Sequence, residues 1–303
     1  MKLFPAAALA SAVLAVLPMS ANAAGVCEKT TASSATACSH AAASAYNYDL
    51  GNCANVINVI DRSKCRATAE KEFAAAGEVC TAQAAAGRSV CNKVGQAAYD
   101  PKINPADFSP VIDNPWLPMQ PGSKYVYRNK SENAEVVITV TNRKIMLMGV
   151  TCIVVHDVNS VGGVIEEDTL DYFAQHKDGS VWYFGEDTIS YEDGVANTKG
   201  SWRAGLNGAK PGIVMFARPA VGKTYRQEFF LGEAEDVAQG FAINQHVKVP
   251  AGTFNNTYQT KDFTALAPGN FEFKYYARGI GNVLVTNPAT GVREELVSFT
   301  PAP

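Results

Sequence analysis

Residues 164–188 read VIEEDTLDYFAQHKDGSVWYFGEDT, two runs of alternating polar and apolar residues joined by Asp178-Gly179. An Asp-Gly pair between two such runs is a strong signal for a two-residue turn between antiparallel strands. The register that follows from this turn places Phe173 opposite Phe184 and Asp171 opposite Glu186. The stretch therefore predicts a β-hairpin on which two acidic side chains face each other.

The same period-two pattern continues along most of the chain after residue 123. Residues 197–211 are the one long irregular stretch, with three glycines and Pro211, and long loops in compact domains often bind ligands. Roughly ten antiparallel strands of this kind are typical of a barrel or a sandwich. We therefore expect an all-β domain over residues 123–303, with strands at 124–128, 135–141, 150–158, 164–175, 181–187, 224–231, 234–249, 254–266, 271–277, 282–286 and 293–299.

Six of the seven cysteines lie before residue 100, with gaps of 11, 15, 12, 15 and 11 residues. An aromatic residue follows the second cysteine of each consecutive pair by eight positions, at Tyr46, Phe73 and Tyr99. The period of 26 or 27 residues indicates a threefold repeat, and its alanine-rich composition favours helices. We therefore expect three small helical hairpins over residues 24–100. The six cysteines are Cys27, Cys38, Cys53, Cys65, Cys80 and Cys91.

The even, wide spacing of these cysteines contains no C-x-x-C pair, so it predicts disulfides in preference to a metal site. Each disulfide would add roughly 2–4 kcal/mol to a segment with too little apolar bulk for its own core. The spacing does not choose among the possible connectivities, and pairing within each unit, beginning with Cys27 and Cys38, is the first expectation. The sequence leaves three roles open for this module: it docks a protein partner, acts as a protease-resistant spacer or caps one end of the β domain.

The first 23 residues have the pattern of a secretory signal. Lys2 precedes an apolar run over residues 3–17, and Ala21-Asn22-Ala23 has the form of a cleavage site. The run is shorter than the roughly 20 apolar residues that a spanning helix needs. We expect cleavage after Ala23 and an exported protein, periplasmic or extracellular, without a transmembrane segment.

Residues 101–122 form a proline-rich stretch between the two parts of the chain. Prolines recur there from Pro101 to Pro121, and they exclude a regular helix or a central strand. The stretch predicts an ordered linker.

The charge of the chain argues against a polyanionic partner. Without residues 1–23 the protein carries 25 basic and 29 acidic side chains, and it has no basic block. Neither nucleic acid nor an anionic membrane is expected as a partner.

Several strings resemble a family of uncharacterised secreted bacterial proteins: NPWLP at residues 114–118, EDTLDY at 167–172, VWYFGEDT at 181–188 and GSWRAG at 200–205. This resemblance covers about residues 105–300. The segment KYYARGIG at residues 274–281 is similar to the closing strands of lipocalin-like or lipoprotein-carrier barrels. By analogy, the second resemblance implies a barrel with a ligand lumen.

The predicted hairpin brings acids together. Asp171 and Glu186 face each other, with Glu167 farther along the same side, and two opposed acids within about 5 Å destabilise a sheet unless something compensates. A divalent cation such as Ca²⁺, bound by these three residues, could compensate for the repulsion. A proton held between the pair could also compensate, and it would turn one carboxyl group into a general acid. The third means of compensation is an ion pair with an arginine, and the candidates are Arg203, Arg226 and Arg278.

Other residues on the predicted strands have a structural and a functional interpretation. Cys152 is expected to be a small core residue, with a thiol–imidazole pair to His156 as the alternative. Four aromatic residues could stack on a flat ligand, although aromatics on strands lie more often in a core; they are Tyr172, Trp182, Phe184 and Trp202. Most of the further acids are expected on a solvated surface; they are Asp157, Glu166, Asp168, Asp187, Glu228, Glu233, Glu235 and Asp236.

No motif of a serine hydrolase, zinc protease, nucleotide-binding loop or EF-hand occurs in the sequence. The leading hypothesis is a secreted or periplasmic binding protein with a lipocalin-like barrel for a small or apolar ligand, stabilised by a cation if the acids bind one. One alternative is an extracellular hydrolase that uses the Asp171–Glu186 pair, with or without a divalent metal. The other is an envelope or matrix protein that docks a partner through the cysteine module.

Overall fold

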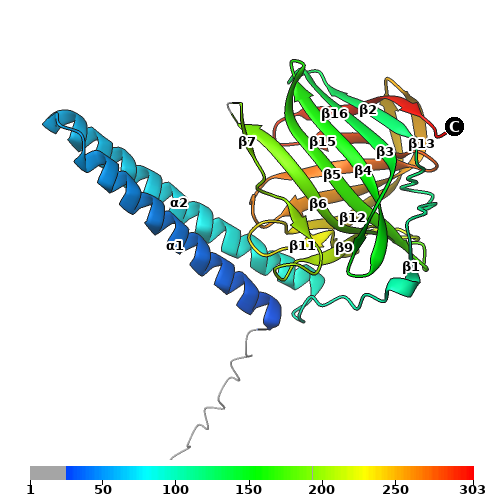
Figure 1. The fold of residues 1–303 in the computed structure, drawn as a ribbon, viewed down its shortest axis with the longest axis horizontal. Coiled ribbons are helices and arrows are strands. Elements are labelled where there is room, and N and C mark those ends of the chain that lie inside the picture. The colour runs from blue at the N-terminus through cyan, green and yellow to red at the C-terminus, as the bar shows by residue number, and fades with distance from the viewer. Residues whose placement is uncertain (1–24, 193) are drawn as a thin grey trace, which may run out of the picture.

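The computed structural model describes residues 25–192 and 194–303, so the signal expected over residues 1–23 lies outside the described residues. Two helices, α1 (Val26–Ala54) and α2 (Val59–Val94), form one long hairpin that projects from a barrel of antiparallel strands (Figure 1). The expected fold class, a mainly antiparallel β domain preceded by a disulfide-rich helical module, is confirmed. None of the helices in the described part of the chain is both long and apolar enough to cross a membrane.

The helical hairpin has three disulfides, as predicted, and the expected Cys53–Cys65 pair is confirmed, but the other two expected pairs and the three small hairpins are wrong. The bonds join Cys27 to Cys91, Cys38 to Cys80 and Cys53 to Cys65, and each of them links α1 to α2. Gaps of 11 and 15 residues are close to three and four helical turns, so the cysteines of each helix lie along one stripe. The series of gaps is also symmetric about the turn, and this symmetry fits one hairpin better than a repeat.

Little apolar surface is buried between the two helices. The buried residues of α1 are Cys27 and Cys53, and those of α2 include Cys80 and Cys91. The α2 helix starts at a cap, where the side chain of Asn58 accepts hydrogen bonds from the backbone N–H groups of the next turn, at 2.9 and 3.2 Å. The disulfides therefore supply much of the stability that a hydrophobic core would give to another helical hairpin.

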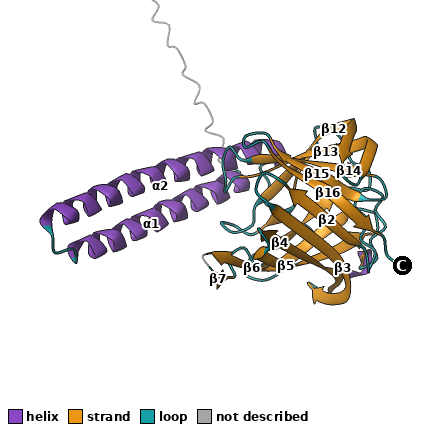
Figure 2. Ribbon diagram, turned by 90° about the horizontal axis from the view of Figure 1, so that it is seen from above, coloured by secondary structure: helices purple, strands orange, loops and turns teal. Residues whose placement is uncertain are grey.

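The sheet runs through 13 strands in the order β10-β12-β13-β14-β15-β16-β2-β3-β4-β5-β6-β9-β11, with three short strands beside this path. Figure 2 shows the strands curving around a common interior. The bounds are β1 Phe108–Ser109, β2 Lys124–Asn129, β3 Ala134–Leu147, β4 Val150–Val161, β5 Val164–His176, β6 Val181–Glu192, β7 Val195–Asn197, β8 Trp202–Arg203, β9 Lys210–Met215, β10 Thr224–Arg226, β11 Glu228–Phe229, β12 Asp236–Val249, β13 Gly252–Thr264, β14 Phe271–Ala277, β15 Gly281–Asn287 and β16 Val292–Thr300.

The two ends of the sheet are neighbours in sequence. Strands β10 and β11 occupy opposite ends of the strand order, yet only Gln227 separates them. The backbone N–H of Gln227 donates to the carbonyl of Asp236 at 2.8 Å, which ties the junction to β12. The sheet is therefore nearly closed into a barrel.

The β5–β6 hairpin keeps the predicted Asp171–Glu186 pair but not the predicted turn. Three residues join His176 to Ser180, so Phe173 pairs with Tyr183 and not with Phe184. A bulge at Phe184 then adds one residue to β6, which restores the predicted register beyond it. Gly185 sits at the bulge with φ +138°, and a Cβ there would meet the carbonyl oxygen of Trp202 at 2.3 Å.

The proline-rich stretch lies against the barrel. Phe108 pairs with His176 of β5, and Ile112 and Trp116 are buried. Asn114, 1% exposed, holds the stretch in place: its side chain donates to the carbonyl of Gly179 and accepts from the backbone N–H of Trp116, both at 2.8 Å. The linker therefore forms part of the barrel's inner core.

Candidate functional site

A cavity of about 410 Å³ occupies the inside of the barrel, and we call it the lumen. Its walls come from both the strands and the proline-rich stretch, which contributes residues 117–119. The lining residues are Leu117, Pro118, Met119, Tyr125, Tyr127, Val136, Ile138, Val140, Val155, Asp157, Asn159, Glu167, Asp171, Phe173, Val214, Gln227, Glu272, Lys274, Tyr276, Ile280, Gly281, Asn282, Val285 and Glu294.

The lumen has apolar and acidic surfaces. Side chains such as Val136, Ile138 and Phe173 form the apolar surface, and strand alternation aims them inward from β3 and β5. The lining carries five carboxyl groups and one amino group, those of Asp157, Glu167, Asp171, Glu272, Glu294 and Lys274. A cavity of this composition suits a ligand with both an apolar part and a polar part.

Tyr183 bridges the acid pair predicted from the sequence. Its hydroxyl lies 2.5 Å from Oδ1 of Asp171 and 2.8 Å from Oε2 of Glu186. One hydroxyl donates one proton, so the second short contact requires either a shared donor or a protonated carboxyl. Burial raises the pKa of both Asp171 and Glu186 to about 7, and a neighbouring charge adds to the effect, that of Asp157 at Asp171 and that of Asp171 at Glu186. The Tyr183 hydroxyl therefore compensates for the close approach of this pair, and the raised pKa values favour a proton on one of the two carboxyl groups.

Asp157 and Glu294 have no hydrogen-bond or ion-pair partner among the described residues, although both line the lumen. Burial, followed by the charge of Glu294, raises the pKa of Asp157 to about 7. Burial, followed by the charge of Glu272, also raises the pKa of Glu294 to about 7. The charge of Lys274 offsets the desolvation cost of these two carboxyl groups only in part.

The arginines considered for the acid pair lie elsewhere. Arg203 forms an ion pair with Asp187, on the face of β6 opposite to Glu186. Arg278 stacks 4.6 Å above the ring of Trp116, and Arg226 lies against Tyr99 and Phe229. The only lysine of the lumen lining, Lys274, pairs with Asp262 at 3.4 Å. None of them offsets the charge of Asp171 or Glu186 directly.

The three predicted cation ligands do not form a metal-binding group in this arrangement. Within residues 25–192 and 194–303, no set of three or more His, Cys, Asp or Glu side chains is placed to hold a metal ion. Asp171 and Glu186 share Tyr183, whereas Glu167 is exposed at the mouth of the lumen.

The four aromatic residues predicted to contact a ligand lie outside the lumen. Tyr172, Phe184 and Trp202 are at most 3% exposed and belong to a second apolar core on the outer side of β4, β5 and β6. Trp182 packs against this core and lines a separate cavity beside the helical hairpin. Their role in binding a ligand stays a prediction.

Cys152 is a core residue, as expected. It is fully buried in the outer core, and burial raises the pKa of its thiol to about 12. His156 pairs with Asp168 at 2.8 Å, and no hydrogen bond joins it to the thiol in the described structure.

Asp157 and Glu294 were not recognised as site residues from the sequence. Both faces of the segment 150–158 are largely apolar, so alternation alone does not show which side Asp157 takes. The signal that reveals it is the pairing of Asp157 with Thr169, which places it beside Asp171 on the inner face.

Comparison of the chain with protein-family models, with curated proteins and with solved structures finds no match. The resemblances drawn from short strings therefore stay predictions, and the chemistry of the lumen carries the functional interpretation.

Proposed function

We propose that this is an exported binding protein whose lumen holds a small amphiphilic ligand with an apolar body and a basic group such as an amine. The observation that carries the proposal is the lumen itself: a cavity of about 410 Å³ whose walls are apolar in one part and lined by unpaired carboxyl groups in another. The three disulfides support export, because such bonds persist mainly in oxidising compartments.

The basic group follows from the charge of the lining. Five acids face one lysine, and Asp157 and Glu294 have no partner in the described part of the chain. A bound cation would favour the ionised carboxylates and offset their desolvation, whereas an anionic ligand would be repelled. The apolar surface would hold the rest of the molecule by burial, at roughly 25 cal/mol per Å².

Calorimetric titration with three eight-carbon probes tests this proposal. At pH 7 we expect octylamine to bind at least about tenfold more tightly than octanol, and octanoate to bind weakest. Asp157→Asn should weaken octylamine binding and leave octanol binding unchanged. Asp168→Asn is the matched control, because Asp168 pairs with His156 and is absent from the lumen lining. Equal binding of the three probes would exclude the basic group, and no binding of any probe would exclude the lumen as a site for such ligands.

The hydrolase alternative has less support. Two-carboxylate glycosidases hold their acids roughly 5–9 Å apart, so that a glycosidic bond can lie between them. Here the hydroxyl of Tyr183 contacts both Asp171 and Glu186 and occupies the space between the two carboxyl groups. Octylamine binding without hydrolysis of sugar substrates is the outcome expected from this geometry.

A further inference from the structure

A second cavity, of about 250 Å³, lies where the base of the helical hairpin meets the barrel wall, and we call it the joint pocket. It is separate from the lumen, with which it shares no lining residue. Its lining residues are Val26, Cys27, Thr30, Val94, Gly95, Ala97, Ala98, Tyr99, Pro101, Trp182, Ile213, Thr224, Tyr225, Arg226 and Phe229.

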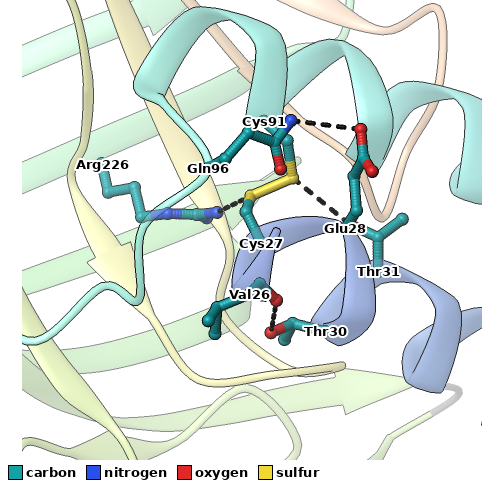
Figure 3. The surroundings of a disulfide bond; sticks show 8 residues. All are labelled: Val26, Cys27, Glu28, Thr30, Thr31, Cys91, Gln96 and Arg226. Atoms are coloured by element: carbon teal, nitrogen blue, oxygen red, sulfur yellow. Dashed lines mark hydrogen bonds between the residues drawn. A yellow bond between two sulfur atoms is a disulfide. The ribbon is translucent and has the colours of Figure 1, made fainter. Parts of the chain in front are cut away.

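Arg226 is the one charged side chain among these lining residues. It is 9% exposed, and Figure 3 shows it reaching from β10 toward the Cys27–Cys91 disulfide. One N–H of its guanidinium points at Sγ of Cys27 at 3.7 Å, which is a weak acceptor. Its charged group also lies over two aromatic rings, 4.8 Å from Phe229 and 5.7 Å from Tyr99.

No carboxylate in the described residues pairs with this guanidinium. Glu28, the acid drawn in Figure 3, accepts a hydrogen bond from Gln96 at 3.1 Å instead. Burial lowers the pKa of Arg226, and the charge of Glu235 offsets this only in part. A second donor at the same pocket, the indole N–H of Trp182, also lacks an acceptor within the described part of the chain.

Cation–π contacts do not replace a counter-ion. Such contacts contribute about 0.5–2 kcal/mol, whereas the removal of an unpaired ion from water costs several kcal/mol. An anion at the guanidinium would repay that cost, because a carboxylate can accept two parallel N–H···O bonds from arginine. The single positive charge and the apolar walls favour a monoanion with an apolar body over a phosphate, which needs more donors.

We propose that the joint pocket binds a small organic carboxylate, with the carboxylate on Arg226 and the apolar body against Val26, Ile213 and Phe229. The volume is below the roughly 300–1,000 Å³ of pockets for drug-sized ligands, so the ligand is a small acid. Since residues from α1, α2 and the barrel all contribute to the lining, the bound acid contacts both parts of the molecule.

Titration of the full chain with benzoate, phenylacetate and hexanoate, each compared with its neutral amide, tests the inference. At least one acid should bind more tightly than its amide by about tenfold or more. Arg226→Met should remove that preference, and Arg226→Lys should restore part of it. Lys223→Met is the matched control, since Lys223 is exposed and lies outside the lining, and it should leave binding unchanged.

Two further variants separate the joint pocket from the lumen and from effects on folding. Ala98→Leu should weaken acid binding by filling the pocket without touching Arg226, so it tests the site even if both Arg226 variants fail to fold. Asp157→Asn, inside the lumen, should leave acid binding unchanged. The inference is overturned if no acid binds at up to about 10 mM, if acids and amides bind equally, or if a folded Arg226→Met protein keeps the preference.

Discussion

Asp157, Asp171 and Glu294, which line the lumen, hold their protons more tightly than ordinary acids do. Burial raises the pKa of all three to about 7. At neutral pH the protein therefore keeps some of these groups protonated or bears the cost of ionising them. This cost is the physical basis for expecting a cationic ligand.

Replacement of Asp157 by asparagine should stabilise the protein at pH 8. The amide removes a charge that has no partner in the described structure, and a gain of about 1–3 kcal/mol in the free energy of unfolding is expected. At pH 5 the gain should be small, because the carboxyl group is then largely protonated in the folded state. Urea unfolding at the two pH values measures it, with Asp168→Asn as control; a loss of stability at pH 8 would contradict the interpretation.

Removal of the Tyr183 hydroxyl should destabilise the protein by about 1–3 kcal/mol, and by more at pH 8 than at pH 5. The hydroxyl separates Asp171 from Glu186, and without it two ionised groups face each other. Tyr125→Phe is a suitable control, because that hydroxyl donates to the carbonyl of Pro118 at 3.2 Å and burial alone raises its pKa. Equal, pH-independent losses in both variants would argue against the role of Tyr183.

Some residues of the site could be predicted from the sequence. The Asp-Gly turn and the alternating pattern indicated the Asp171–Glu186 pair, although the three-residue turn and the bulge at Phe184 shift the register in opposite directions and cancel. The lumen position of Asp157 could not be predicted, since it depends on how β4 pairs with β5 and not on β4 alone.

At the level of elements, the stability of the helical hairpin depends on its three disulfides. The cysteine spacing predicted the disulfides but left their partners open, because an even spacing is compatible with a translated repeat or with a folded-back pair of helices. The strand β9 was missed for a different reason. Its sequence contains Pro211 and Gly212, which are rare in strands, and the approach of Gln227 accounts for the glycine: a Cβ there would meet the backbone of Gln227 at 2.3 Å.

The double replacement of Cys38 and Cys80 by alanine should loosen the helical hairpin and leave the barrel intact. This bond spans 42 residues, and its loss should cost the hairpin about 4 kcal/mol by loop-closure entropy. Hydrogen exchange should rise along the middle of α1 and α2 and stay unchanged in the barrel strands. Faster exchange throughout the barrel would show that the two parts unfold together.

At the level of the whole molecule, the acidic interior makes stability depend on pH. An acid whose pKa is raised by folding binds more protons in the folded state than in the unfolded state, so stability falls as pH rises from about 4 to 8. The acids Asp157, Asp171, Glu186, Glu228 and Glu294 act in this direction. Asp100 and Asp187, whose pKa values lysine and arginine partners lower, act the other way, and their contribution is lost only below about pH 4.

The free energy of unfolding should therefore be larger at pH 5 than at pH 8, by several kcal/mol in low salt. Urea titrations at intermediate pH values give the full curve. A profile that is flat or rises between pH 5 and pH 8 would show that the interior acids are ionised at little cost in the folded protein.

The most direct test of the central claim, a lumen for amphiphilic cations, is the proton balance of octylamine binding at pH 7. Calorimetry in two buffers with different ionisation heats measures it. A cation beside carboxyl groups with pKa values near 7 should lower those values, so we predict the release of up to about one proton per amine bound, and a smaller release for Glu294→Gln. Binding of octylamine with no proton release, or no binding at all, would contradict the account.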